Sequence, residues 1–559
     1  MNKRLHATLL ALPLIAAAPL AGQTPPNDTA AEPLKDPLAA SFRAHVAFLA
    51  DDLLQGRAIG TPGHEIAANY VAQAFARAGL QPAGSDGWFQ RISFAESRFA
   101  SERETATLAL PGATLTLENG KQMVLSPGDT AGAETISGGL VFAGFGLKDP
   151  SQNIDDFAGL DVRGKYVVVL AGAPAGMNSE VAAHLARTSK AVAAEAAGAI
   201  GIITVRTLRE AQRLPWDKFA ARARTPRRVT LGPDGGPMGD GAGLKVRASI
   251  DDAAATALFA GASMNFAAVQ AAAAAGPVKG FALPGTFTVR RATSVERISS
   301  PNVIGYLPGR DPVLRDQIVV ISAHLDHVGV KADAKPGEDA IFNGAMDNAT
   351  GTATLLEAAA ALAKTPPRRT VLFLATTAEE SGLLGASYFA ANPTVEARRI
   401  IADVNIDMPI LTCDFGDVVA FGGDRSTIGP VVAAAARAEG LGTSPDPQPE
   451  EAVFTRSDHY PFVRRGVPSV FLKTGWTDSK GGITCKDAER QFRLNSYHEV
   501  SDQLDLPFDW AAAAKWTRLN IGIIRRLANG NAAPRWYEGD YFGTAFAPEA
   551  PKAPKPKPR

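Results

Sequence analysis

The stretch Ile318-Val-Val-Ile-Ser-Ala-His-Leu-Asp-His327 decides the fold, because an apolar run of strand length ends directly in imidazole and carboxylate side chains. Around it, apolar strand-like runs alternate with helical patterns. We predict strands at 318–322, 370–375, 400–406, 418–421 and 469–472, and helices at 351–363, 428–439 and 510–527. This alternation is typical of an α/β fold in which a mostly parallel, mixed sheet is sandwiched by helices.

The residues just beyond the predicted strands are rich in metal-ligand types. Ligands bind beyond the carboxyl ends of the strands in open α/β sheets. The residues there are His324, Asp326 and His327 after the first strand, Glu379 and Glu380 after the second, Asp407 after the third, Asp347 before the first helix and His498 near the last helix. Each residue alone has a structural explanation, such as Asp347 capping its helix. Together, as ordinary zinc ligands at one sheet edge, they predict a metal site.

Other hydrolase signatures are incomplete in this sequence. His64-Glu65 and His498-Glu499 each begin an H-E-x-x-H pattern, but both lack the second histidine. No G-x-S-x-G elbow occurs either. The residues at the strand ends are therefore the candidate site.

These residues resemble the co-catalytic di-zinc exopeptidases, a family that includes secreted bacterial aminopeptidases and glutamate carboxypeptidases. The resemblance rests on five motifs in family order: Ala323-His324-Leu325-Asp326-His327, Asp347-Asn348, Glu379-Glu380-Ser381-Gly382, Asn405-Ile406-Asp407-Met408 and Tyr497-His498. It covers roughly 302–527 and the N-terminal helices. Met346 departs from the pattern, because many members have a second acidic residue there.

The resemblance implies two zinc ions per chain and assigns their ligands. One ion would be held by His324 and Asp407, and the other by Glu380 and His498. Asp347 would bridge the two ions, and a water or hydroxide would complete the bridge.

The resemblance also implies roles for residues that do not bind metal. Glu379 would be the general base, and Tyr497 would donate a hydrogen bond to the carbonyl oxygen as it becomes an oxyanion. Asp326 would orient His324, as residues behind metal-bound histidines usually do. Arg456 resembles a substrate-contacting position, with a structural ion pair as the alternative.

The function that follows is a metal-dependent exopeptidase that hydrolyses the N-terminal peptide bond of peptides through a water activated by two zinc ions. The acidic sheet edge suits a free α-amine, whereas Arg456 is the main cation available for a free carboxylate, with Arg464 and Arg465 close by. The alternatives are a glutamate-carboxypeptidase-like exopeptidase, a single-zinc glutaminyl cyclase and a non-catalytic receptor-like ectodomain. The complete ligand set argues against the last two.

Changes in pattern along the chain predict its organisation. We expect a signal peptide at 1–22, a linker at 23–37, the first part of the catalytic domain at 38–131, an insert at 132–283, the di-zinc peptidase domain at 284–545 and a disordered Pro/Lys-rich tail at 546–559. The insert offers no catalytic candidates and resembles the protease-associated domain often found in such enzymes. We expect it to be rich in β-structure.

The N-terminus predicts export to the periplasm or the outside. Lys3 and Arg4 precede an apolar stretch at 5–22, which is the pattern of a secretory signal. An uncleaved anchor is the alternative, and after cleavage no membrane-spanning segment is expected. Cys413 and Cys485 are the two cysteines of the chain. They can pair in an oxidising compartment, but the sequence leaves open whether they do.

Composition limits the classes of partner. Lys plus Arg number 57 and Asp plus Glu number 57, so the formal net charge is zero. A neutral chain gives no long-range attraction for polyphosphate, which argues against nucleic acid as the main partner. The 46% hydrophobic and 20% charged residues exclude a disordered chain and support a large folded core. Peptides are the expected substrates.

Overall fold

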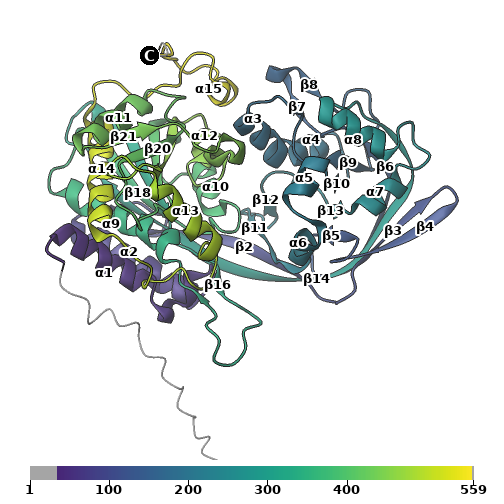
Figure 1. The fold of residues 1–559 in the computed structure, drawn as a ribbon, viewed down its shortest axis with the longest axis horizontal. Coiled ribbons are helices and arrows are strands. Elements are labelled where there is room, and N and C mark those ends of the chain that lie inside the picture. Colours follow the sequence, from purple (N-terminus) through teal and green to yellow (C-terminus); the bar gives the residue numbers. More distant parts are fainter. Residues whose placement is uncertain (1–33, 557–559) are drawn as a thin grey trace, which may run out of the picture.

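The computed structural model describes residues 34–556, which form two lobes joined side by side (Figure 1). The predicted signal peptide and most of the predicted linker lie outside the described residues. The first lobe contains α1 (Pro37–Leu49), α2 (Pro62–Ala78), α9 (Thr350–Ala363), α10 (Leu384–Ala391), α11 (Ile428–Ala438), α12 (Tyr460–Val463), α13 (Thr484–Asn495) and α14 (Trp510–Asn529). The second lobe contains α3 (Ser179–His184), α4 (Lys190–Ala196), α5 (Leu208–Arg213), α6 (Trp216–Ala220), α7 (Asp252–Leu258) and α8 (Phe266–Ala275).

A mostly parallel sheet forms the centre of the first lobe. Its parallel strands are, in spatial order, β18 (Thr370–Thr376), β15 (Ile318–His324), β19 (Ile400–Ile406) and β22 (Ser469–Thr474). The antiparallel strands β14 (Phe281–Leu307) and β20 (Asp417–Phe421) flank them, and β21 (Gly442–Ser444) pairs with β20. The five strands predicted in this region are all present, and the predicted fold class is confirmed.

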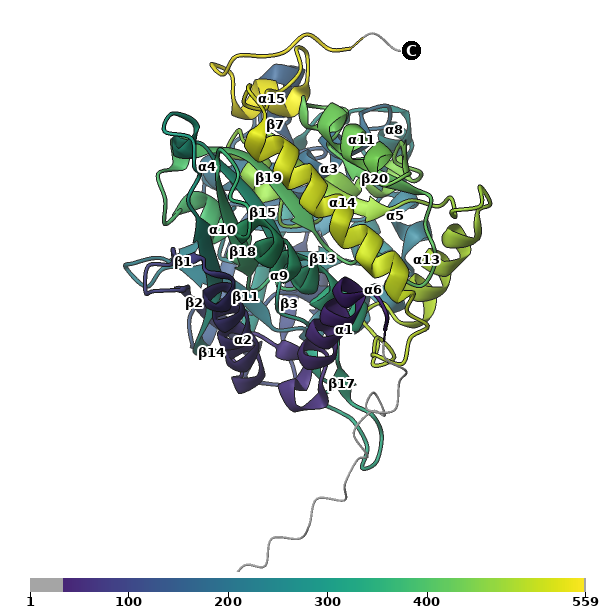
Figure 2. The ribbon, with the colours of Figure 1, turned by 90° about the vertical axis from the view of Figure 1, so that its left-hand side faces the viewer.

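Alternate side chains of β15 enter separate cores on the two faces of this sheet. Val319 and Ile321 share a core with α1, α2, α9 and α14, which lie together over one face (Figure 2). Ile318 and Val320 share the opposite core with α10 and α12. A strand that is covered on both faces must be apolar throughout, as the sequence of β15 is.

The helix boundaries follow from capping residues. Helix α2 begins after Thr61, whose side chain accepts a backbone N–H, and has Pro62 in its first turn. It ends at Gly79, whose φ of 86° lies in the left-handed region that glycine adopts without steric cost. Helix α14 begins after Asp509, whose carboxylate accepts the N–H of Ala512. Local sequence thus sets where these two helices start and stop.

The second lobe has a parallel sheet of its own. Its strands are, in spatial order, β6 (Gly132–Phe142), β9 (Tyr166–Leu170), β10 (Gly201–Val205) and β13 (Val246–Ile250). Val167 and Val169 share one core with α4, whereas Val168 and Leu170 share another with α7 and α8. This lobe is therefore a sheet with helices packed on both of its faces.

The hairpin strands that precede this sheet pack with the second lobe. They are β3 (Thr105–Leu110), β4 (Ala113–Glu118) and β5 (Met123–Leu125). Leu108, Leu117 and Met123 lie in the same core as the strands of that lobe. We therefore propose that the insert begins near residue 105, upstream of the predicted start at 132. Its assignment as a protease-associated domain stays a prediction.

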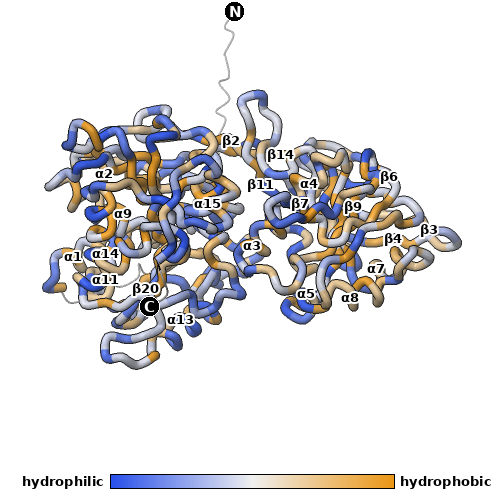
Figure 3. Tube along the Cα trace, turned by 90° about the horizontal axis from the view of Figure 1, so that it is seen from above, coloured by the Kyte–Doolittle hydropathy of each residue, from blue (hydrophilic) through white to orange (hydrophobic). Residues whose placement is uncertain are grey.

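One long strand connects the two lobes. The 27-residue strand β14 pairs with β6 and β3 at one end, with β2 (Phe89–Phe99) in the middle and with β18 at the other end. Viewed from above, the lobes lie side by side with α3 near their junction (Figure 3). Side chains also cross this junction. Arg464 pairs with Asp240 at 2.9 Å, and the Tyr460 hydroxyl lies 2.5 Å from Nδ1 of His184.

The C-terminal segment is ordered as far as the structure describes it. Its Pro/Lys-rich composition predicts disorder at 546–559. Instead, the chain after α15 (Tyr541–Phe546) folds back, and Ala553 donates its N–H to the Trp536 carbonyl at 2.8 Å. Ala553 in turn accepts the N–H of Glu538 at 2.8 Å. These backbone hydrogen bonds hold the Pro/Lys-rich segment against the fold, so the predicted disorder is not found up to residue 556.

The two cysteines are paired. A disulfide joins Cys413, in the loop after β19, to Cys485 in α13, with the two Cα atoms 5.5 Å apart. This resolves the choice that the sequence left open, because cysteines 72 positions apart in sequence can be brought together only by the fold. Among residues 34–556, no helix is long and apolar enough to cross a membrane.

Candidate metal centre

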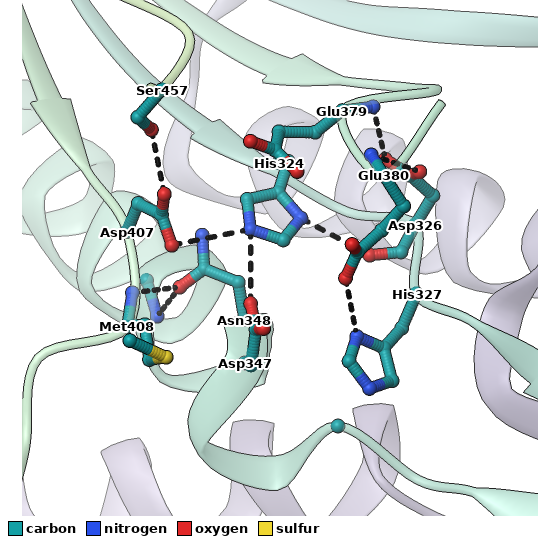
Figure 4. A network of polar contacts seen from close by, with 12 residues as sticks. His324, Asp326, His327, Asp347, Asn348, Glu379, Glu380, Asp407, Met408 and Ser457 are labelled. Carbon is teal, nitrogen blue, oxygen red and sulfur yellow. Dashed lines mark hydrogen bonds and ion pairs between the residues drawn. The ribbon is translucent and has the colours of Figure 1, made fainter. Parts of the chain in front are cut away.

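The predicted ligand side chains converge at the carboxyl end of the central sheet, and Figure 4 shows all of them except His498. His324 is the last residue of β15, and Asp407 directly follows β19. Glu380 lies in the loop after β18, and Asp347 lies in the turn before α9. His498 arrives from the loop after α13. Parallel strands explain the convergence, because their carboxyl ends meet at one edge.

The carboxylate of Asp347 lies between two imidazoles. Its Oδ1 is 3.2 Å from Nε2 of His324, and its Oδ2 is 3.2 Å from Nε2 of His498. Each imidazole also faces a second carboxylate. His324 Nε2 lies 3.3 Å from Oδ1 of Asp407, and His498 Nε2 lies 3.1 Å from Oε2 of Glu380. The five side chains thus form two sets of ligand atoms that share Asp347.

The donor atoms fit bound metal. His324, Asp347 and Glu380 each offer a ligand atom, and these atoms lie within 4.8 Å of one another. Each set around Asp347 contains one imidazole nitrogen and two carboxylate oxygens, the number of protein ligands typical of a catalytic zinc ion. The side chains of Asp347 and His324 are only 4% and 2% exposed. Buried carboxylates in this number call for a compensating positive charge.

Asp326 contributes to the site in two ways. Its backbone carbonyl accepts a hydrogen bond from Nδ1 of His324 at 3.1 Å, which leaves Nε2 of that ring to face the other ligands. Its carboxylate accepts the backbone N–H groups of Glu379 at 3.1 Å and Glu380 at 3.3 Å. The contact with His324 therefore runs through the backbone of Asp326, whereas the side chain positions the loop that carries both glutamates.

His327 lies at the site as well, although the resemblance assigned it neither a metal nor a catalytic step. Its Nδ1 donates to Oε1 of Glu380 at 2.8 Å, and its ring centroid lies 5.6 Å from that of His498. It is 2% exposed. The signal was present in the sequence, since His327 ends the motif that starts at His324. It holds the carboxylate of Glu380 in the orientation that faces His498.

Two further residues support the aspartates from behind. Ser457 donates its hydroxyl to Oδ2 of Asp407 at 2.6 Å. The carboxylate of Asp502 accepts the backbone N–H groups of Met346 and Asp347. Asp502 follows His498 by four residues, and sequence spacing alone does not reveal that it reaches the turn before α9.

Arg57 joins the loops that carry these ligands. It is 1% exposed and donates to the carbonyls of Leu325 at 2.9 Å, Asn343 at 2.6 Å and Gly344 at 3.0 Å. Burial lowers the pKa of Arg57 to about 10, against the attraction of Asp502. The guanidinium is therefore charged at neutral pH. It lies more than 260 residues before the loops it joins, so no local pattern predicts the contact.

A cavity of about 300 Å³ opens beside the ligand atoms. Its wall includes Glu379, Arg456, Lys473, Arg493 and Tyr497. Burial, together with the nearby Glu380 and Asp407 carboxylates, raises the pKa of Glu379 well above its ordinary value. Tyr497 stacks on His498 with ring centroids 4.0 Å apart. The cavity thus exposes an acid–base group and a phenol beside the ligand cluster.

Arg456 lines the same cavity. Its guanidinium pairs with Glu451 at 3.0 Å, and both side chains are partly exposed. The structural ion pair and the predicted place at the substrate cavity are therefore both present. His459, three residues further on, is fully buried between Phe454 and Phe471 and packs in the core.

Fold and site together define an α/β domain with a candidate metal centre at the edge of its sheet. Residues 302–524 match the model of Peptidase family M28, so this segment is similar to the domain of that family.

Curated relatives align over short segments. Aminopeptidase YwaD of Bacillus subtilis (strain 168) is 32% identical over 111 residues, which is 20% of this chain and 22% of the relative. An aminopeptidase of Pseudomonas aeruginosa (strain UCBPP-PA14) is 36% identical over 115 residues, 20% of this chain and 19% of the relative. The probable leucine aminopeptidase 2 of Aspergillus oryzae is 30% identical over 187 residues, 32% and 34% of the two chains. The chain thus spans between 19% and 34% of the length of these relatives.

A solved structure matches over both lobes. The aminopeptidase from Aneurinibacillus sp. strain AM-1 superposes with a TM-score of 0.51 at 19% identity, covering 88% of this chain and 94% of that chain. The likeness shows a shared fold.

Proposed function

We propose that the protein is a zinc-dependent aminopeptidase that releases the N-terminal residue of peptides. The observation that carries the proposal is the Asp347 carboxylate, which turns one oxygen toward His324 and the other toward His498. A carboxylate in that position suits a bridge between two metal ions. The aminopeptidase names of the aligned relatives support the same activity.

The metal is proposed to be two zinc ions per chain. His324 and Asp407 would hold one ion, Glu380 and His498 the other, and Asp347 both. Bound zinc supplies Lewis acidity, which polarises the scissile carbonyl and activates a water for attack.

Side chains of the protein carry out the proton transfers and stabilise the charge that develops on the substrate. Glu379 accepts a proton from the attacking water and passes it to the leaving amine. Its carboxylate lies in the cavity wall beside the ligand cluster, where an attacking water would be held. The Tyr497 hydroxyl donates a hydrogen bond to the carbonyl oxygen as it gains charge. Arg456, at the cavity wall, contacts the substrate.

The end of the peptide that is recognised follows from the charge around the cavity. The carboxylates at the sheet edge suit a free α-amine. Arg456 is partly compensated by Glu451, which weakens its attraction for a free C-terminal carboxylate. These charges favour an aminopeptidase over a glutamate-carboxypeptidase-like exopeptidase.

The test uses two blocked forms of one tetrapeptide and the zinc-loaded full chain. N-acetylation is expected to stop hydrolysis, whereas C-amidation is expected to leave it within about threefold. The reverse pattern would leave the metal chemistry standing and overturn the aminopeptidase assignment. Hydrolysis of neither form would count against peptidase activity as a whole.

Export of the protein is part of the proposal. The disulfide between Cys413 and Cys485 supports an oxidising compartment, such as the periplasm or the outside. The N-terminal signal pattern points the same way. The second lobe is proposed to be a protease-associated domain.

A further inference from the structure

Lys473 is a buried cation beside the candidate metal centre. It lies in β22, and its neighbour Leu472 pairs in register with Ile406 of β19. Lys473 and Asp407 therefore stand one residue further along two adjacent parallel strands. The side chain of Lys473 lines the same cavity as the ligand cluster and is 6% exposed as a residue.

Lys473 has no direct partner of opposite charge. Among the described residues it forms no hydrogen bond or ion pair through Nζ, and its contact is with the ring of Phe471, whose centroid lies 5.7 Å away. Burial, and then the charge of Arg493, lower the pKa of Lys473 to about 8. A substrate carboxylate placed at Nζ would favour the charged ammonium form. A buried charge without a partner is unfavourable unless a ligand supplies one.

The other cations of this cavity are already paired. Arg456 pairs with Glu451 at 3.0 Å, and Arg493 pairs with Glu489 at 3.0 Å. Glu489 also accepts the indole N–H of Trp476 at 2.6 Å, so it is occupied by two donors. Lys473 is thus the cation of the described cavity wall whose charge is not offset by a direct ion pair.

The carboxylates that attract Lys473 from further away have other roles. They are Asp407, Glu489 and Asp347. Glu489 is held by its two donors, and Asp407 and Asp347 are the proposed metal ligands. When those two aspartates bind metal, their charge is compensated locally. Lys473 then remains the free positive group beside the reacting centre.

We propose that Lys473 is a specificity-determining residue that binds a carboxylate on the substrate residue next to the scissile bond. The proposal rests on the proposed function and names its substrate class, peptides with an acidic group at that residue. Ammonium–carboxylate hydrogen bonds are among the stronger ones available to proteins. Lys473 lines the cavity of about 300 Å³ beside the ligand atoms, so a substrate residue held there lies within reach of its ammonium group.

The carboxylate has two sources that share this chemistry. It is either the side chain of an N-terminal Asp or Glu, or the free α-carboxylate of a dipeptide. Two matched substrate pairs separate them. Glu-p-nitroanilide against Gln-p-nitroanilide changes the side-chain charge alone, and Ala-Leu against Ala-Leu amide changes the α-carboxylate alone.

The experiment measures kcat and KM for these four substrates with the zinc-loaded full chain and three variants. Lys473→Met removes the charge at similar volume, and Lys473→Arg keeps it. Lys486→Met is the matched control, because Lys486 also lies over an aromatic ring, that of Trp476, but is exposed and outside the cavity wall. The wild type is expected to prefer the charged member of one pair by at least about 10-fold.

The Met variant is expected to lower kcat/KM for that charged substrate by about 10- to 100-fold, mainly through KM, while the neutral member changes by less than about threefold. The Arg variant and the Lys486→Met control are expected to keep the preference. Normal kcat/KM for the neutral substrates would show that a variant is folded and still catalyses the reaction. The pair that responds identifies the source of the carboxylate.

Three results would overturn the role of Lys473. In the first, the wild type prefers neither charged substrate. In the second, the Lys473→Met variant keeps the preference, and in the third its kcat/KM falls equally for charged and neutral substrates. Failure of the proposed function looks different, because the zinc-loaded wild type would then hydrolyse none of the four substrates.

Discussion

The carboxylate of Asp502 holds the backbone of Asp347. It accepts the N–H of Asp347 at 3.0 Å and the N–H of the preceding Met346 at 2.8 Å, one with each oxygen. Asp502 is fully buried, so both hydrogen bonds form away from water. Because Asp347 faces His324 and His498 at once, a small rotation of its backbone would move an oxygen away from one of them. Asp502 therefore sets the geometry of the ligand cluster without being part of it.

Asp502→Asn should weaken metal binding by about 10- to 100-fold, the usual effect of losing a residue that supports a metal ligand. The side-chain amide has one acceptor oxygen, so one of the two N–H groups loses its partner. Zinc affinity is measured by competition with a chelator of known affinity. Asp505→Asn, a change at an exposed aspartate three residues on, is the control. Equal zinc affinity in the two variants would show that Asp502 is not needed for the cluster.

Removal of metal should abolish peptidase activity while the fold persists. The ligands come from the ends of separate strands whose cores lie beneath them, so the sheet does not depend on the metal. Chelation followed by zinc or cobalt should restore activity, with circular dichroism unchanged throughout. Full activity in protein shown to be metal-free by elemental analysis would contradict the proposed chemistry.

Glu379→Gln and Asp347→Ala should separate the base from the ligands. The Gln variant should retain both metal ions and lose at least about 10²-fold in kcat, the usual scale of general acid–base catalysis. The Ala variant should lose metal, because it removes a carboxylate that faces both imidazoles. Metal content and single-substrate kinetics are measured for both. Near-normal turnover in the Gln variant would remove Glu379 from the mechanism.

Sequence reasoning succeeded where chemistry follows directly from a strand. His324 ends β15 and Asp407 follows β19, so the apolar runs predict both the strands of the sheet and the edge at which the ligand residues lie. Sequence reasoning failed where two residues that contact each other lie far apart along the chain. Arg57 reaches the carbonyl of Leu325, 268 positions later, and no spacing rule reports such a contact.

Burial is a second kind of information that the sequence does not supply. Lys473 directly follows the apolar run predicted at 469–472 and resembles a solvated residue at a strand end, yet the fold places it in the cavity wall at 6% exposure. The tail was expected to be disordered from its composition, but Ala553 is 4% exposed and pairs with Trp536. In both cases the neighbours come from other parts of the chain and decide the outcome.

The junction of the lobes should be sensitive to acid through His184. This side chain is buried among Tyr460, Tyr541, Phe542 and Phe546, and its Nδ1 lies 2.5 Å from the Tyr460 hydroxyl. Burial, and then the charge of Arg464, lower the pKa of His184 to about 4. An unfolded histidine titrates near 6.5, so between these values the unfolded chain binds the proton and the folded chain does not.

Stability should therefore be constant above about pH 6.5 and should fall as the pH drops toward 4, by at most about 3 kcal/mol from this residue. His184→Gln cannot take up the proton, so its melting temperature should fall less between pH 7 and pH 5 than that of the wild type. Thr188→Val is the control. It removes a hydroxyl that lies 3.0 Å from Nδ1 of His184 but adds no titrating group, and it should lower the melting temperature by the same amount at both pH values. An equal acid shift in the wild type and in His184→Gln would show that the junction does not respond to this histidine.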